Sequence, residues 1–130
     1  GQYIPQTCGE ITRCIFDSLA LRYRQVMNLL RDFAEFPIER LHIIGGGSRN
    51  KQLSQFTSNA TNLPVTTGPV EGTAIGNIML QAKAAGLVKT IGEMRALISR
   101  SIETAQFEPQ DEALWAKGYE KYLSVYHEDI

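Results

Sequence analysis

The most informative segment of the chain reads His42-Ile43-Ile44-Gly45-Gly46-Gly47-Ser48-Arg49-Asn50. Residues 41–44 before the glycines are apolar and rich in β-branched side chains, which predicts a buried strand. Residues 50–61 after them carry apolar side chains on one face of a helix, and residues 63–67 predict a second strand. A strand, a glycine turn, a helix and a strand form a βαβ unit, whose two strands are parallel and whose crossover is right-handed.

Helices are predicted on both sides of this unit. Residues 10–36 have the apolar spacing of one long amphipathic helix that ends at Pro37. Thr7 and Glu10 form a capping-box pattern at its start. Further helices are predicted over 71–85, 91–102 and 111–127, and residues 104–110 are predicted to be extended. The last helix carries an aromatic stripe that is typical of a helix docked on a core: Trp115, Tyr119, Tyr122 and Tyr126. Two pairs of arginines are predicted to be solvated on helix faces: Arg22 with Arg24, and Arg95 with Arg100.

Two predicted strands against five helices leave both edges of the sheet open. Parallel sheets are normally larger and covered on both faces. We therefore expect residues 1–130 to be part of a larger α/β sheet, completed by preceding sequence or by a second copy, and we expect the isolated chain to self-associate.

Composition excludes several classes of protein. The 130 residues carry 13 basic and 14 acidic side chains and a net charge of −1, so no basic surface for nucleic acid or for an anionic membrane is expected. No apolar run reaches the length of a membrane span, and residues 1–5 do not resemble a leader. Cys8 and Cys14 are expected to be free thiols of a cytoplasmic protein, and no Cys/His cluster predicts a metal site.

The glycine turn is the candidate binding site. Three consecutive glycines let a ligand approach the backbone closely, and the following helix offers N–H groups and a positive dipole end. This pattern favours a nucleotide, although a tight connection with no ligand is the alternative. A Rossmann site is excluded because Asn50 replaces its third glycine, and a P-loop is excluded because Lys51 is not followed by Ser or Thr.

Three segments resemble the C-terminal region of FGGY-family carbohydrate kinases. They are residues 14–24 (CIFDSLALRYR), 42–50 (HIIGGGSRN) and 68–77 (GPVEGTAIGN). Within the family, the sequences of these three motifs are most similar to those of the kinases that act on L-rhamnulose; fuculose and xylulose kinases remain alternatives. Gly72 departs from the pattern, because family members commonly have alanine there.

The resemblance implies an ATP- and Mg²⁺-dependent kinase of a ketose sugar, built from two actin-like, ribonuclease-H-like domains. Residues 1–130 would be the C-terminal portion of its second, nucleotide-binding domain. Gly45, Gly46 and Gly47 would form the floor of the ATP/ADP site, and Ser48 and Asn50 are candidates to hydrogen-bond the base or the ribose. The catalytic aspartate of the family belongs to a preceding segment, so this chain alone is expected to be inactive. The alternative is a stand-alone, non-catalytic nucleotide-binding or interaction module.

Overall fold

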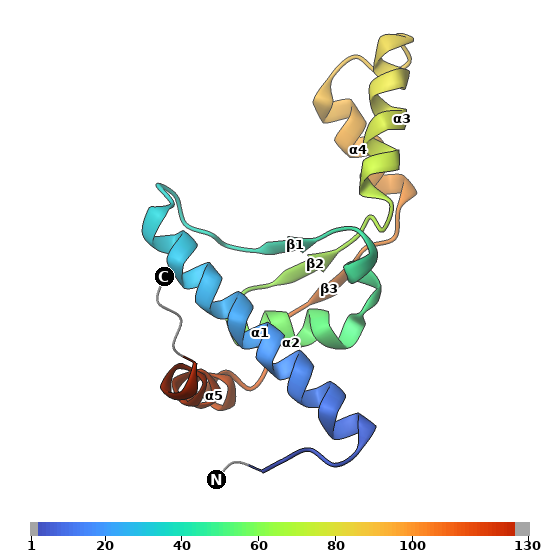
Figure 1. Ribbon diagram of the computed structural model, residues 1–130. Coiled ribbons are helices and arrows are strands. Elements are labelled where there is room, and N and C mark those ends of the chain that lie inside the picture. Colours follow the sequence, from blue (N-terminus) through green and yellow to red (C-terminus); the bar gives the residue numbers. More distant parts are fainter. Residues whose placement is uncertain (1–2, 127–130) are drawn as a thin grey trace.

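The structure is a computed structural model that describes residues 3–126 (Figure 1). The elements follow in the order α1 (Cys8–Phe33), β1 (Leu41–Ile43), the 3₁₀ turn η1 (Gly46–Arg49), α2 (Lys51–Thr61), β2 (Val65–Thr67), α3 (Gly72–Ala84), α4 (Ile91–Ser101), β3 (Ala105–Phe107) and α5 (Glu112–Val125). All five predicted helices are present. Residue 127 of the last predicted helix lies outside the described residues.

The first helix shows how local sequence determines its ends. The side chain of Thr7 accepts from the backbone N–H of Glu10, and the Glu10 carboxylate accepts from the backbone N–H of Thr7, so the predicted capping box is confirmed. The helix ends at Phe33, earlier than predicted. Pro37 also disfavours the helical conformation of the residue before it, and the chain leaves the helix ahead of that restriction.

The sheet has three strands in the order β1-β2-β3. β1 and β2 are parallel, with Leu41 opposite Val65, which confirms the βαβ unit. The prediction of two strands was wrong, because β3 pairs antiparallel to β2 with Phe107 opposite Val65. Within the described residues, the outer edges of β1 and β3 have no partner strand.

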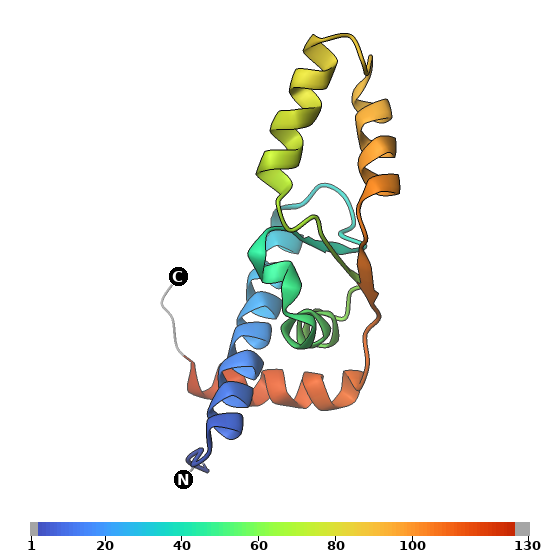
Figure 2. The same ribbon diagram turned by 90° about the vertical axis from the view of Figure 1, so that its right-hand side faces the viewer.

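The two faces of the sheet differ in character. Figures 1 and 2 show α1, α2 and α5 on one side of it. Val65 and Thr67 are buried, whereas His42 and Gln106, which flank Thr66 on the other face, are exposed. The prediction that β1 is fully buried was therefore wrong: its side chains alternate as in a sheet with one polar face.

The core lies where α1, α2 and α5 meet. Ala20 of α1 and Ala60 of α2 are completely buried, and such small side chains let the two helices approach closely. Phe56 of α2 packs against Trp115 of α5 with ring centroids 5.4 Å apart. Trp115 thus docks α5 on the core, as the aromatic stripe predicted.

The rest of the aromatic stripe faces arginines of α1. The guanidinium of Arg24 lies 4.6 Å from the ring centroid of Tyr119, and that of Arg22 lies 5.4 Å from Tyr126. Both arginines are half-buried, so the prediction that they are simply solvated was wrong. In these cation–π contacts the guanidinium groups cover the faces of the tyrosine rings, as apolar side chains do in other cores.

Helices α3 and α4 form an arm that projects from the body (Figures 1 and 2). No residue of α3 is buried, and Met94 is the buried residue of α4. Gly76 has no atom within 4 Å of where a Cβ would lie. The small residues of α3 therefore do not serve the close packing that the sequence suggested, within the part of the chain that the structure describes.

Candidate functional site

The predicted glycine turn begins at Gly45, whose backbone conformation requires glycine. Gly45 has φ 80° and ψ −167°, a conformation that is essentially restricted to glycine. Its backbone N–H donates to the carbonyl of Pro69 over 3.0 Å. The turn that follows β1 is thus tied to the segment that precedes α3.

Ser48 closes the turn from inside. Its side chain is buried, with 7% of its surface exposed. Its Oγ–H donates to the Gly45 carbonyl over 2.6 Å, and its backbone N–H donates to the same oxygen over 3.0 Å. Because its only side-chain hydrogen is used here, the hydroxyl can offer a ligand nothing but an acceptor.

Asn50 is the N-cap of α2. Its Oδ1 accepts from the backbone N–H of Leu53 over 3.0 Å, which satisfies one of the N–H groups left over at the start of the helix. The two hydrogens of Nδ2 make no hydrogen bond within residues 3–126. Asn50 can therefore donate toward a neighbouring acceptor while it caps the helix.

Gly46 and Gly47 differ from Gly45. Both are exposed, neither has a positive φ, and neither has an atom within 4 Å of where a Cβ would lie. Their backbone N–H groups donate to no acceptor in the described part of the chain. Neither conformation nor packing thus requires glycine at these two positions.

The second motif lies beside the turn. The Gly68 N–H donates to the carbonyl of Ile43 over 2.9 Å, and a Cβ on Gly72 would lie 3.8 Å from the side chains of Ile44 and Pro69. Two motifs that are some twenty residues apart in the sequence are therefore in direct contact. Glu71 occupies the N-cap position of α3 without a side-chain cap, so its contribution there is its charge at the helix start.

An apolar hollow of about 520 Å³ borders the same region. It lies between α1 and α2 along the free edge of β1, with Gly47 in its wall. Tyr23 and Val26 of α1 and Leu53 of α2 supply much of its apolar lining. Such a surface suits an apolar or aromatic group more than a charged one.

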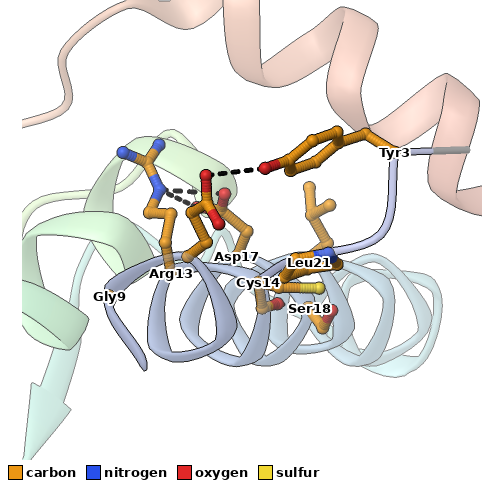
Figure 3. A pocket seen from close by; sticks show the side chains of 9 residues that line it. Tyr3, Gly9, Arg13, Cys14, Asp17, Ser18 and Leu21 are labelled. Carbon is orange, nitrogen blue, oxygen red and sulfur yellow. Dashed lines mark hydrogen bonds and ion pairs between the residues drawn. The ribbon is translucent and has the colours of Figure 1, made fainter. Parts of the chain in front are cut away.

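A second hollow, of about 470 Å³, lies at the start of α1 (Figure 3). Glu10 there accepts from the Tyr3 hydroxyl over 2.8 Å, and its other oxygen accepts from two backbone N–H groups. These backbone bonds lower the pKa of Glu10 from 4.5 to about 2, and the bond to Glu10 raises the pKa of Tyr3. Arg13 pairs with Asp17 at 2.8 Å. Glu10 is thus engaged by Tyr3 and the backbone, and Arg13 and Asp17 are engaged with each other.

Other groups that could carry chemistry are dispersed. Cys8 and Cys14 are free, as predicted, and both are exposed. Among the described residues no three His, Cys, Asp or Glu side chains come together as a metal site would require. None of the described helices has both the length and the apolar character needed to cross a membrane.

Comparisons with known proteins agree with the resemblance. Residues 1–85 match the family model described as "FGGY family of carbohydrate kinases, C-terminal domain". The rhamnulokinase of Bacteroides thetaiotaomicron is 56% identical over 119 residues, which cover 92% of this chain and 24% of that protein. The rhamnulokinase of Bacillus subtilis is 43% identical over 110 residues, covering 85% of this chain and 23% of that protein. This chain thus spans about a quarter of the length of these relatives.

Solved structures show the same fold. A Plasmodium falciparum glycerol kinase with ADP aligns with a TM-score of 0.73 at 20% identity, covering 98% of this chain and 26% of that one. A xylulose kinase from Rhodospirillum rubrum aligns with a TM-score of 0.72 at 21% identity, covering 97% of this chain and 26% of that one. The predicted fold class, part of an actin-like, ribonuclease-H-like α/β domain, is confirmed.

Proposed function

Since the chain belongs to the FGGY family of carbohydrate kinases, we propose that it supplies the adenosine side of the ATP site of a rhamnulokinase. In that enzyme the γ-phosphoryl group of ATP passes to the 1-hydroxyl of L-rhamnulose. Residues 1–130 are proposed as the C-terminal portion of its second domain. The residues that bind the sugar, the general base and the residues that make the remaining phosphate contacts are proposed to lie in other parts of the enzyme. This chain alone is therefore proposed to be inactive.

Gly46 and Gly47 carry the proposal. A glycine that neither a positive φ nor a close neighbour requires is better explained by something that approaches the backbone from outside. Both residues are exposed and their N–H groups have no acceptor in the described structure, so these groups can donate to ribose or phosphate oxygens. Gly45 completes the floor by fixing the direction of the turn.

Asn50 is the proposed side-chain donor of the site, and Ser48 is a buried residue of the same turn. Because Oδ1 of Asn50 caps α2, its Nδ2 favours a ligand atom that accepts, such as a ring nitrogen or a ribose oxygen. Mg²⁺ is proposed to enter with ATP and to be held by its phosphates and by acids elsewhere in the enzyme, where it would neutralise charge on the transferred group.

The test compares alanine variants of the chain by titration with ADP. Gly46→Ala and Gly47→Ala are expected to unfold at a urea midpoint no lower than that of the wild type but to bind ADP about tenfold more weakly, since a methyl group would stand between ligand and backbone. Gly118→Ala is the matched control, because a Cβ on Gly118 would also have no atom within 4 Å, but Gly118 lies on α5, outside both motifs. Equal ADP affinity in all four proteins, or the absence of amide shifts over residues 45–50, would contradict the nucleotide site.

The open sheet supports a proposal about partners. The free edge of β1 runs beside the apolar hollow of about 520 Å³, and α1 exposes further apolar residues, among them Ile15 and Phe33. An unpaired edge next to an apolar groove favours pairing with another strand, so we propose that the isolated chain self-associates. Sedimentation equilibrium of the chain tests this, and a monomer at millimolar concentration would contradict it.

The cytoplasm, where exposed thiols such as Cys8 and Cys14 stay reduced, is the proposed location.

A further inference from the structure

We propose that Ser48 is a positioning residue of the nucleotide site: it holds the Gly45 carbonyl so that the Gly46 N–H points out of the turn, toward the ligand. This inference rests on the proposed function. It assigns to Ser48 a different role from the direct hydrogen bond to base or ribose that the sequence suggested.

The Gly45 carbonyl is held by two donors from one residue. The Ser48 hydroxyl lies 2.6 Å from this oxygen and the Ser48 backbone nitrogen lies 3.0 Å from it. On its other side, Gly45 donates its own N–H to Pro69. Both peptide groups that flank the Gly45 Cα are therefore fixed by hydrogen bonds.

Peptide geometry then sets the direction of the next donor. The Gly45 carbonyl and the Gly46 N–H belong to the same planar, trans peptide group, in which C=O and N–H point in opposite directions. Because Ser48 draws the carbonyl into the turn, the Gly46 N–H must point away from it. No hydrogen bond to Gly46 itself is needed for this orientation.

Ser48 is poorly suited to contact the nucleotide directly. With 7% of its surface exposed, Ser48 is buried whereas Gly46 and Gly47 are exposed, and its only hydroxyl hydrogen is already donated. Without the hydroxyl, the Gly45 carbonyl would keep only the backbone donor. Gly45 is a glycine, so the peptide could then rotate with little resistance, and a misdirected N–H would weaken binding.

The experiment compares Ser48→Ala with Ser54→Ala in the 130-residue chain. Ser54 is a matched control because its side chain is also buried and also donates to one backbone carbonyl, that of Asn50 over 2.9 Å. Each variant loses one buried hydroxyl, so similar shifts of the urea midpoint are expected. Nuclear magnetic resonance provides the two decisive measurements: the ¹⁵N order parameter of Gly46 without ligand, and the affinity for ADP from amide shifts.

Ser48→Ala is expected to lower the Gly46 order parameter and to weaken ADP about tenfold, the loss that one oriented hydrogen bond represents. Ser54→Ala is expected to change neither, and Ser48→Thr, which keeps the hydroxyl, is expected to restore both. If the wild type binds ADP and Ser48→Ala binds it with equal affinity, the inference is overturned and the proposed function is left intact. A wild-type chain whose turn amides do not respond to ADP would overturn both.

Discussion

Gly45 gives the sharpest test of how the turn is built. Its φ of 80° and ψ of −167° lie where an L-residue is strained, yet a Cβ at this position would meet no atom within 4 Å. Gly45→Ala therefore isolates backbone strain from steric overlap. Gly46→Ala, one residue further on, has the same open space without the positive φ.

The magnitude follows from two opposing effects. Holding alanine in a conformation that is essentially restricted to glycine costs about 1–3 kcal/mol. Alanine also reduces the conformational entropy of the unfolded chain, which returns about 0.4–1 kcal/mol. The free energy of unfolding of Gly45→Ala should thus fall by about 1–2 kcal/mol, whereas that of Gly46→Ala, which has the entropy gain without the strain, should be unchanged or rise by up to about 1 kcal/mol.

Urea unfolding, followed by the fluorescence of Trp115, measures both variants in the same way. Trp115 is the single tryptophan of the chain and lies in its core. A third protein, made by chemical synthesis with D-alanine at position 45, should regain wild-type stability, because a D-residue accepts the mirror-image conformation. Equal stability of Gly45→Ala and Gly46→Ala would refute the reasoning, since it would show that the turn does not need a positive φ.

Three further predictions concern the arm, the first helix and the core. Gly68→Ala should destabilise the chain by about 1–3 kcal/mol, because φ is 99° and the new Cβ would lie 3.3 Å from the Glu103 carbonyl, whereas Gly72→Ala should be neutral or stabilising by up to about 1 kcal/mol; urea midpoints that move in the same direction would contradict this pair. The pKa of Glu10 is about 2 in the fold and 4.5 ordinarily, so ionised Glu10 stabilises the fold above about pH 4.5 and this contribution is lost as the pH falls toward 2. The urea midpoint of Glu10→Gln should therefore fall less over this range than that of the wild type, and parallel profiles would count against the cap. Phe56→Ala should cost about 3–5 kcal/mol, and Phe36→Ala, whose parent side chain is 71% exposed, is the matched control that should cost less than about 0.5 kcal/mol.

Local signals in the sequence predicted the elements that depend on neighbouring residues. The capping box of Thr7 and Glu10 needs only residues three apart, and the βαβ unit needs only a strand, a glycine turn and a helix in order. Both are confirmed. The apolar face predicted for the helix over residues 50–61 likewise includes Phe56 and Ala60, which lie in the core.

The sequence could not predict what depends on distant partners. β3 is three residues long and pairs with a strand some forty residues before it, so no local period distinguishes it from an extended loop. The sequence predicts exposed charges at Arg22 and Arg24, but in the fold tyrosine rings of α5 contact their guanidinium groups. A hydrophilic residue tells nothing by itself about which aromatic side chain will stack on it.

The candidate site divides in the same way. The glycine turn at Gly45, Gly46 and Gly47 follows from the sequence, because only the order of strand, glycines and helix is needed, whereas its role as a nucleotide site stays a prediction. The sequence does not show why each of the three positions is glycine, since that depends on the φ angle and on the neighbouring atoms at each position. The direction of the Ser48 hydroxyl also depends on the folded turn, and a hydroxyl next to a glycine run is equally compatible with a ligand contact.

The way the α3–α4 arm joins the body has a consequence for how the fold can change. Its two ends meet where Gly68 approaches the carbonyl of Glu103, directly beyond the antiparallel pair of β2 and β3. Topologically, the helices are an insertion at the tip of a β-hairpin. Because the entropy of closing a loop grows only slowly with its length, the arm beyond residue 77 can lengthen or shorten while the strands keep their register. The three-stranded sheet, with the motif of residues 68–77 that contacts the glycine turn, is thus the fixed frame of the molecule, and the rest of the arm is the part that is free to diverge.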